Sequence, residues 1–321
     1  MTELQRYLAE EVAEDHADGI ITRREAVRRL ALLGVGAGAA ATLLGATATD
    51  AAAKHGHRGH ADHGRNGGQG GQGGHGGPGG HGGQGGQSEA VDWAPVATEA
   101  VTFTGPAGQL MAAWAPAAGR MRGAVLVIHE NRGLNDHIRN VAGRFAASGY
   151  AALALDLLSE EGGTAAFPGE AEVAAALSAA PPARFDADMK AAVTELRRRA
   201  PRAPIAAIGF CFGGGMVWRL LAAGEDRLDA AAPFYGPFPQ GGDLSGAKAA
   251  VLGIYGGLDA RVNATRDAAR AALEAAGLDH RIVTFAAADH AFFNDTGPRF
   301  NAPAAEEAWH RVLSWFGGRP R

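Results

Sequence analysis

Three side chains in the second half of the chain have the types and the order that covalent hydrolysis needs, and the first belongs to the only cysteine. Cys211 lies at the centre of Gly-Phe-Cys-Phe-Gly, residues 209–213, between a predicted strand and a predicted helix. This Gly-x-nucleophile-x-Gly pattern predicts a sharp turn that lifts the thiol above the end of a sheet. The N-terminus of the following helix would favour the thiolate. The alternative interpretation is an inert cysteine buried beside a tight turn.

A thiol nucleophile needs a base, and the base needs a group that orients it. His290 follows the last predicted strand, and Asp259 follows the strand before it. A carboxylate at that position can accept the imidazole N–H, although a turn aspartate or a helix cap would look the same in the sequence. Asp289 is a competing acid, but its side chain should point away from that of its neighbour His290. The order nucleophile, acid, histidine is that of α/β-hydrolases.

Acyl transfer also needs N–H groups that stabilise a tetrahedral oxyanion. We expect one from the main chain of Phe212, the residue after the nucleophile, and another from Asn131, in the loop after a buried strand. The pair His129 and Glu130 in that loop could suggest a metal site, but no histidine stands four residues after His129, as a zincin helix requires. We therefore predict neither a metal ion nor an organic cofactor.

Short apolar runs alternate with helix-like stretches from about residue 100 onward, which favours an open, mostly parallel sheet. Continuous apolar runs suit parallel strands that are covered on both faces. The predicted strands are 124–128, 151–155, 205–208, 230–234, 251–255 and 281–285, with an antiparallel hairpin at 101–103 and 110–114. The predicted helices are 136–148, 186–199, 215–223, 264–276 and 303–316. The expected fold class is α/β, an α/β-hydrolase fold with helices on both faces of the sheet.

The first 53 residues have the organisation of an export signal. A charged segment contains the pair Arg23-Arg24, an uncharged apolar stretch runs from Leu30 to Leu44, and small residues follow. The adjacent arginines resemble a twin-arginine signal. A membrane anchor is the alternative, but the apolar stretch is short for a bilayer and rich in glycine. The segment predicts recognition by the twin-arginine export machinery, a periplasmic or extracellular location, and no stable membrane insertion after processing.

Residues 54–88 are mostly glycine and glutamine with almost nothing apolar, so burial cannot offset the entropy cost of ordering them. A flexible linker is the expected role, and weak binding of a transition metal by imidazoles is the alternative. The histidines of this segment are His55, His57, His60, His63, His75 and His81. The predicted organisation is thus a signal at 1–53, a linker at 54–88 and a folded domain at 89–321.

The composition excludes some classes of protein. Apolar residues make up 46% and charged residues 20% of the chain, which permits a sizeable core. The formal net charge of −4 offers no broad attraction to nucleic acid, so we expect no nucleic-acid partner. A single cysteine excludes an intramolecular disulfide and a multi-cysteine zinc site.

Four motifs in the observed order resemble the dienelactone hydrolase family. They are Glu130 in Ile-His-Glu-Asn-Arg-Gly-Leu-Asn, Cys211 in Gly-Phe-Cys-Phe-Gly-Gly, Asp259 in Gly-Gly-Leu-Asp and His290 in His-Ala-Phe-Phe-Asn-Asp. The resemblance implies that Cys211 attacks, His290 acts as the base and Asp259 orients it. It also implies that Glu130 lies near the resting thiol and helps to release the thiolate, whereas the alternative for Glu130 is a solvated loop residue. The implied substrate is a cyclic enol-lactone or another small ester that bears a carboxylate.

The chain departs from the catabolic members of that family at two places. Asn294 stands where an arginine four residues after the catalytic histidine helps to bind the substrate carboxylate, and residues 156–161 carry acids where an arginine would help to hold an anion. We expect Arg132, Arg299 and Tyr235 to bind the substrate here.

Three functions remain open from the sequence. The first is a thiol-dependent hydrolase of a small ester or lactone, and the second is a non-catalytic binding protein on a hydrolase scaffold. The third is metal binding or surface interaction through the histidine-rich segment 54–88. Deleting this segment would separate the first from the third, because only the third predicts a lost function.

Overall fold

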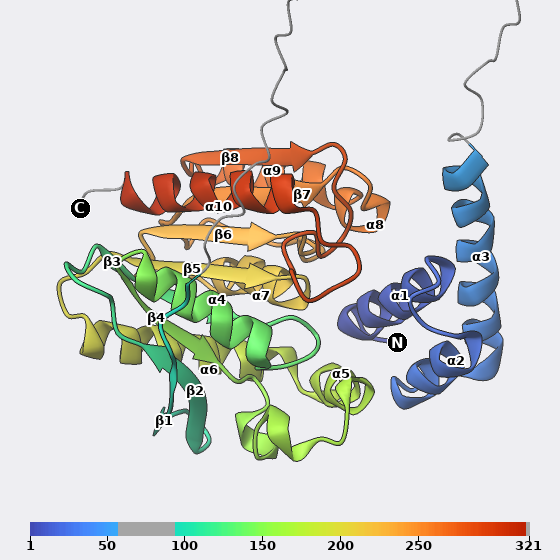
Figure 1. Cartoon of the computed structure of the whole chain (residues 1–321), viewed down its shortest axis with the longest axis horizontal. Helices are drawn as coiled ribbons and strands as arrows, with labels where there is room; N and C mark the ends of the chain where they lie inside the picture. The colour runs from blue at the N-terminus through green and yellow to red at the C-terminus, as the bar shows by residue number, and fades with distance from the viewer. Residues whose placement is uncertain (57–93, 319–321) are drawn as a thin grey trace, which may run out of the picture.

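The computed structural model describes residues 1–56 and 94–318, and an eight-stranded sheet forms the centre of the described chain (Figure 1). The strand order is β1-β2-β4-β3-β5-β6-β7-β8, with β1 and β2 antiparallel and the strands from β4 to β8 parallel. The strands are β1 (Glu99–Thr104), β2 (Gln109–Ala115), β3 (Gly123–Ile128), β4 (Tyr150–Leu155), β5 (Ile205–Phe210), β6 (Ala230–Phe234), β7 (Ala250–Gly256) and β8 (His280–Phe285).

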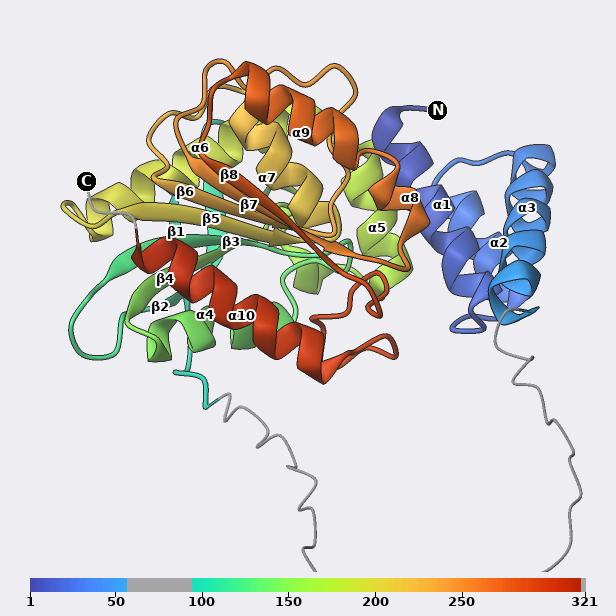
Figure 2. The same ribbon diagram turned by 90° about the horizontal axis from the view of Figure 1, so that it is seen from above.

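Helices cover both faces of the sheet, as Figure 2 shows from above. Helices α4 and α10 lie on one face, and α6, α7 and α9 lie on the other. The helices that follow the first strand are α4 (Asp136–Ala147), α5 (Glu170–Ala179), α6 (Pro182–Arg199), α7 (Phe212–Ala222), α8 (Ala260–Asn263), α9 (Arg266–Ala275) and α10 (Ala302–Gly317). Two short 3₁₀ turns, η1 (Ser159–Glu161) and η2 (Thr164–Ala166), precede α5.

The central strands form because their side chains are apolar on both faces. Every residue of β3 is buried, and its Ala124 pairs with Ala151 of β4 on one side and with Ile205 of β5 on the other. Small alanines in β4 and β6 leave room for the helices that pack above and below. The predicted α/β fold is confirmed, and the predicted strands and helices differ from the observed ones by a few residues at their ends. The helices α5 and α8 and the two 3₁₀ turns were not predicted in this domain, nor were the helices that precede β1.

The first 56 residues form three helices, α1 (Glu3–Ala17), α2 (Arg23–Leu32) and α3 (Ala37–Gly56). Thr2 and Gln5 begin α1 with a capping box, in which each side chain accepts a hydrogen bond from the main chain of the other residue. Figure 1 shows α1 at the end of the sheet toward which the parallel strands point. Helix α3 continues three residues into the predicted linker, and the rest of that linker lies outside the described residues. Among the helices described, none combines the length and the apolar character that crossing a bilayer requires.

Candidate active site

The turn between β5 and α7 holds Cys211 in an unusual backbone conformation, with φ at 55° and ψ at −119°. A residue other than glycine rarely adopts a positive φ, and such strain is typical of functional turns. The chain crosses itself closely here, since a Cβ atom at Gly209 would lie 2.1 Å from the carbonyl oxygen of Gly213. A Cβ at Gly213 would lie 2.4 Å from the carbonyl oxygen of Ile128, at the end of β3. The two glycines therefore permit the turn that presents the sulfur at the carboxyl end of the sheet.

Replacing Gly213 by alanine should both destabilise the fold and displace the loop after β3. The obstructing atoms are main-chain oxygens, which cannot rotate away, so we expect a loss of about 3 kcal/mol in the free energy of unfolding. Urea denaturation of Gly213→Ala would measure it. The matched control is Gly108→Ala, because a Cβ at Gly108 meets nothing within 4 Å. Equal stability of the two variants would contradict the crowded turn.

Asp259 and His290 form a buried hydrogen-bonded pair at the ends of β7 and β8. Nδ1 of His290 lies 2.6 Å from Oδ2 of Asp259, while Oδ1 of Asp259 accepts the main-chain N–H of Val262 at 3.0 Å and caps α8. Asp259 thus has both of the roles that its sequence position suggested. Asp289 accepts the main-chain N–H of His290 at 2.7 Å and does not contact the ring. Of the two acids, only Asp259 has a hydrogen bond to the imidazole.

The sulfur of Cys211 lies beside this pair. Three atoms lie within 4.8 Å of one another: the sulfur of Cys211, a ring nitrogen of His290 and a carboxylate oxygen of Glu11. Burial disfavours a charged imidazole, but the charges of Asp259 and Cys211 and the hydrogen bonds to them together outweigh burial and raise the pKa of His290 well above its ordinary value. Burial, reinforced by the carboxylate of Glu11, raises the pKa of the Cys211 thiol. Burial and the charge of Glu11 therefore both disfavour the thiolate in the structure described.

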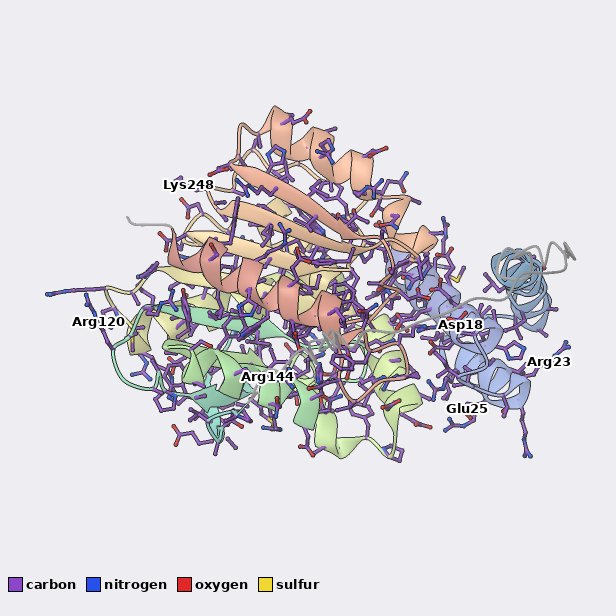
Figure 3. The ribbon with its side chains drawn as sticks, turned by 45° about the horizontal axis from the view of Figure 1, so that its top comes forward. Asp18, Arg23, Glu25, Arg120, Arg144 and Lys248 are labelled. Carbon is purple, nitrogen blue, oxygen red and sulfur yellow. The ribbon has the colours of Figure 1, made fainter. Side chains whose placement is uncertain are left out.

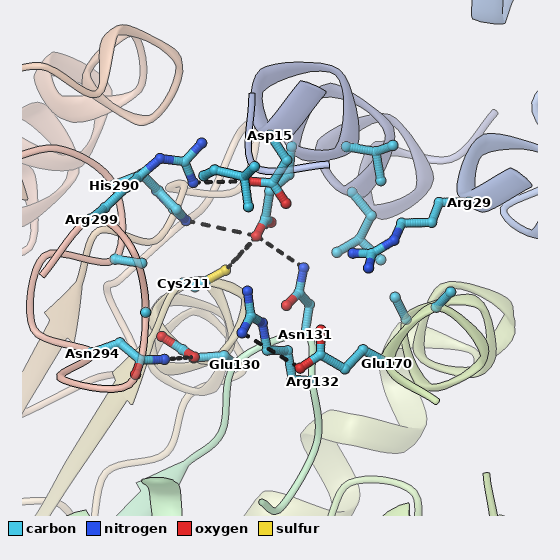
Figure 4. A pocket seen from close by; sticks show the side chains of 18 of the residues that line it. Asp15, Arg29, Glu130, Asn131, Arg132, Glu170, Cys211, His290, Asn294 and Arg299 are labelled. Carbon is cyan, nitrogen blue, oxygen red and sulfur yellow. Dashed lines mark hydrogen bonds and ion pairs between the residues drawn. The ribbon is translucent and has the colours of Figure 1, made fainter. Parts of the chain in front are cut away.

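The loop after β3 holds Glu130 in the same cavity as the sulfur (Figure 4). Nδ2 of Asn294 donates to Oε2 of Glu130 at 2.7 Å, and Oε1 of Glu130 is buried without a hydrogen-bond partner among the described residues. His129 braces the loop, because its Nδ1 donates to the carbonyl of Glu130 at 2.6 Å and its Nε2 accepts the N–H of Leu157 at 3.1 Å. Glu130 is not a solvated loop residue, and Asn294, which departs from the family pattern, positions it.

The two residues expected to donate to the oxyanion both lie close to the sulfur in the chain or in the cavity. Phe212 begins α7 directly after Cys211, and Asn131 lines the cavity that contains the sulfur. Neither main-chain N–H donates to a main-chain acceptor within the described part of the chain. The side chain of Asn131 is engaged elsewhere, since its Nδ2 donates to Oε1 of Glu11 at 2.9 Å.

Two of the three expected substrate-binding residues line the cavity, and the third does not. Arg132 and Arg299 belong to its wall, where Arg132 lies 3.5 Å from Glu170 and Arg299 pairs with Asp15. Tyr235 is fully buried, and the edge of its ring packs against the imidazole of His290 at 5.3 Å between ring centroids. Tyr235 is therefore not exposed to the cavity in this structure, where its ring packs against the histidine, and its contact with substrate stays a prediction.

Two residues next to the sulfur were missed from the sequence, and both come from α1. Both carboxylate oxygens of Glu11 lie 3.4 Å from the sulfur of Cys211, and so does the hydroxyl of Tyr7. A signal was present, because Leu4, Tyr7, Leu8, Glu11, Val12 and Asp15 recur at the spacing of one helix face. An acid within such an apolar stripe indicates a polar partner on the surface that the helix covers.

The loop that carries His290 and Asn294 is anchored by the next residue. Asp295 accepts hydrogen bonds from the side chains of His137 and Arg144, both on α4. Burial would raise the pKa of Asp295, but the hydrogen bond from His137 and the charge of Arg144 outweigh it and hold this pKa at about 2.

Asp295→Asn should therefore lower stability in a way that depends on pH. A depressed carboxyl pKa stabilises the fold fully above the ordinary value near 4, and this stabilisation is lost as the pH falls through about 2. We expect Asp295→Asn to cost about 1–2 kcal/mol at pH 7, allowing for the partial exposure of the pair. Thermal unfolding of the variant and the wild type at pH 7, 5 and 3 would measure this cost. A difference that stays constant over that range would contradict the assignment.

Glu11, Cys211 and His290 are also a group of potential metal ligands, one carboxylate, one sulfur and one imidazole. These donor types suit zinc. Nδ1 of His290 is already bound to Asp259, so Nε2 is the ring atom left to face the sulfur. The sulfur and the imidazole nitrogen of this group are also close enough to exchange a proton. A metal ion bound to both atoms would prevent that exchange.

A nucleophile elbow after β5, an acid after β7 and a histidine after β8 on a mostly parallel sheet define the α/β-hydrolase class. The model of the Dienelactone hydrolase family matches residues 111–319, and the chain belongs to this family. It is accordingly a carboxylic ester hydrolase. The match begins after α1, α2 and α3, so these three helices lie outside the family's common domain.

Several relatives have similar sequences or structures. The chain is 33% identical over 218 residues to a proposed carboxymethylenebutenolidase of Methylorubrum extorquens. The aligned region covers 63% of this chain and 74% of that protein. A proposed carboxymethylenebutenolidase of Yersinia pestis is 33% identical over 209 residues, or 60% of this chain and 76% of that protein. The crystal structure of a proposed dienelactone hydrolase from Klebsiella pneumoniae aligns with a TM-score of 0.60 and 28% identity, over 68% of this chain and 97% of that one.

Proposed function

We propose that the protein hydrolyses a small ester or lactone through Cys211, His290 and Asp259, with a thioester as the intermediate. The observation that carries the proposal is the 2.6 Å contact between Nδ1 of His290 and Asp259, beside the sulfur of Cys211 on a strained elbow. Asp259 fixes the imidazole so that Nε2 faces the sulfur. A fixed imidazole of this kind is the base that a buried thiol needs.

The reaction has two halves. Nε2 of His290 takes the thiol proton, the sulfur bonds to the carbonyl carbon, and the resulting oxyanion collapses with departure of the alcohol, to which His290 returns the proton. Water then attacks the thioester while His290 takes one of its protons. The second oxyanion collapses with cleavage of the carbon–sulfur bond, and the sulfur recovers its proton. The N–H groups of Phe212 and Asn131 would stabilise each oxyanion.

Glu130 is proposed to help release the thiolate. Its buried Oε1 lacks a partner among the described residues, and Asn294 fixes the opposite oxygen. An unpartnered buried carboxylate oxygen can receive a proton or a hydrogen bond from the thiol. In this role Glu130 would lower the barrier to forming the nucleophile by assisting the transfer of the thiol proton to His290, which later acts as the base for water.

The proposed substrate bears a carboxylate near its ester or lactone. Arg132 and Arg299 line the cavity of Cys211 and would supply positive charge, since Asn294 replaces an arginine of the family. Two relatives are named as proposed carboxymethylenebutenolidases. That name denotes the hydrolysis of an enol-lactone that bears a carboxylate. A guanidinium can bind a carboxylate through two parallel hydrogen bonds, which would orient the scissile carbonyl toward the sulfur.

We also propose that the protein acts outside the cytoplasm. Residues 1–53 would serve as a twin-arginine-type signal, and residues 54–88 as the linker that joins it to the hydrolase domain. Arg23 and Arg24 are exposed, and Figure 3 shows Arg23 directed away from the rest of the molecule, where a receptor can reach it. The partners would be the export machinery and a small-molecule substrate.

A panel of lactones and p-nitrophenyl esters, with and without a carboxylate, tests this function. The protein freed of its N-terminal segment should hydrolyse at least one member, and a carboxylate should improve kcat/KM about tenfold or more through Arg132 and Arg299. Arg299→Gln should remove most of that preference while neutral esters react as before. Failure of the freed protein to hydrolyse any member of the panel would refute the proposal.

A further inference from the structure

Helix α1 lies over the sulfur of Cys211. Tyr7 and Glu11, one helical turn apart, both place polar atoms 3.4 Å from that sulfur, and Cys211 is only 2% exposed. Asn131, next to the sulfur in Figure 4, donates its side-chain N–H to Glu11. Groups of α1 therefore occupy the space into which a carbonyl substrate would have to move.

The space that remains is too small for an ester. A carbonyl carbon must come within about 3–3.5 Å of the attacking sulfur, and Tyr7 and Glu11 already lie at that distance. The cavity left beside Cys211 has a volume of about 50 Å³, whereas ligand sites typically have about 300–1,000 Å³. Substrate and α1 cannot both be bound to this cleft.

Charge holds α1 in the cleft. Arg299 binds Asp15 at 2.9 Å and Asp18 at 2.6 Å, as Figure 4 shows for Asp15. Arg261, two residues after Asp259, binds Glu14 at 3.3 Å. The acids of α1 thus engage the same arginine that the proposed function assigns to an anionic substrate, so the helix competes for that site by charge as well as by bulk.

Apolar contacts extend along the same helix. Leu8 and Val12 line the cavity of the sulfur, and a second cavity of about 100 Å³ lies between the first turns of α1 and the residues Phe212 and Met216. Departure of α1 would join the two cavities into one cleft that runs past Cys211. Such a cleft would have Arg299 at one end and an apolar wall at the other.

We propose that α1 is an intramolecular inhibitor that occupies the substrate cleft, and that the hydrolase becomes active when its N-terminal segment is removed. This inference rests on the proposed function, because it takes Cys211 as the nucleophile and 1–53 as a segment that is cut away. The exposed arginine pair stays accessible while α1 is docked. The chain would therefore be exported as a folded and inactive precursor.

Docking also keeps the sulfur unreactive. Burial and the carboxylate of Glu11 are the two leading causes that raise the pKa of the Cys211 thiol. The carboxylate of Glu11 would leave with α1 and the burial of the sulfur would decrease, while the neighbouring His290, which lowers that pKa, would stay. Release of the helix thus uncovers the sulfur and favours its thiolate.

Alkylation by iodoacetamide tests the inference without any ester, because the chain has one cysteine. A protease site is inserted between residues 57 and 93, and intact mass is followed before the cut, after the cut, and after separation of the two fragments. Severing the chain makes docking bimolecular, so the inhibitor is lost on dilution. We expect the separated domain to react about 100-fold faster than the uncut chain. Equal rates for the two would overturn the inference.

Charge reversal provides a second test on the uncut chain. Asp15→Lys combined with Asp18→Lys places like charges against Arg299 and should raise the alkylation rate about tenfold or more. Glu10→Lys is the matched control on the same helix, because Glu10 makes no ion pair among the described residues, and its rate should equal that of the wild type. Faster alkylation of the freed domain with no ester hydrolysis would refute the proposed function alone. Hydrolysis and alkylation that are the same before and after the cut would refute the inhibitor alone.

Discussion

Cys211→Ala should abolish ester hydrolysis, with a loss of about 10⁵-fold in kcat, since removing the nucleophile of a catalytic triad costs about as much as removing the triad. The elbow offers no substitute, because the described residues place no other thiol near His290 and the neighbours of Cys211 in the turn are phenylalanines. The measurement is steady-state hydrolysis by the protein freed of its N-terminal segment. Alanine fits the turn with the same positive φ penalty that cysteine carries, so the thermal midpoint should change little.

Cys211→Ser separates the chemistry of sulfur from the shape of the site. The hydroxyl has a pKa far above that of a thiol and would need stronger base assistance from His290. We expect the serine variant to keep less than about 1% of the activity. Substantial hydrolysis by the alanine variant would show that the elbow does not supply the nucleophile.

Asp259→Asn should lower kcat/KM about 10³–10⁴-fold, because an amide cannot hold the imidazole in the tautomer that receives the thiol proton. Oδ2 of Asp259 lies 2.6 Å from Nδ1 of His290, and its charge is the main cause that raises the pKa of His290 against the opposing effect of burial. Asparagine would keep the cap on α8, since Oδ1 of Asp259 accepts the N–H of Val262. The fold should therefore survive the change.

Asp289→Asn is the matched control for Asp259→Asn. Asp289 is the neighbouring acid, and it contacts only the main-chain N–H of His290, an interaction that an amide oxygen can keep. Its kcat/KM should stay close to that of the wild type. Equal losses in the two variants would mean that neither carboxylate acts through the ring, and that the assignment of Asp259 is wrong.

The hydrolase domain could be predicted because its signals are local in sequence. The elbow at Cys211 needs two glycines, a strand before and a helix after, and all four lie within residues 205–222. Asp259 and His290 could be placed because parallel strands bring their carboxyl ends to one edge of a sheet. The alanine-rich strands β4 and β6 were recognised by their alternation with helices, although alanine by itself favours a helix over a strand.

What the sequence did not predict depends on contacts between distant segments. Residues 1–17 were interpreted only as the charged start of a signal, yet Glu11 reaches the sulfur 200 positions away. Nothing local in the sequence shows that the ring of Tyr235 packs against His290. Asn294 was noted as a missing arginine, whereas its function in the structure is to hold Glu130. Each of these contacts depends on which partner a side chain finds, which spacing alone does not determine.

The most direct test of the account is to look for the acyl group on the sulfur. The freed protein is mixed with an activated ester that deacylates slowly, quenched in acid within the first turnover and digested for mass spectrometry. We expect the peptide that contains Cys211 to gain the mass of the acyl group, in step with the first equivalent of alcohol released. The account would be contradicted if that equivalent of alcohol were released while the Cys211 peptide stayed unmodified and another residue carried the acyl group.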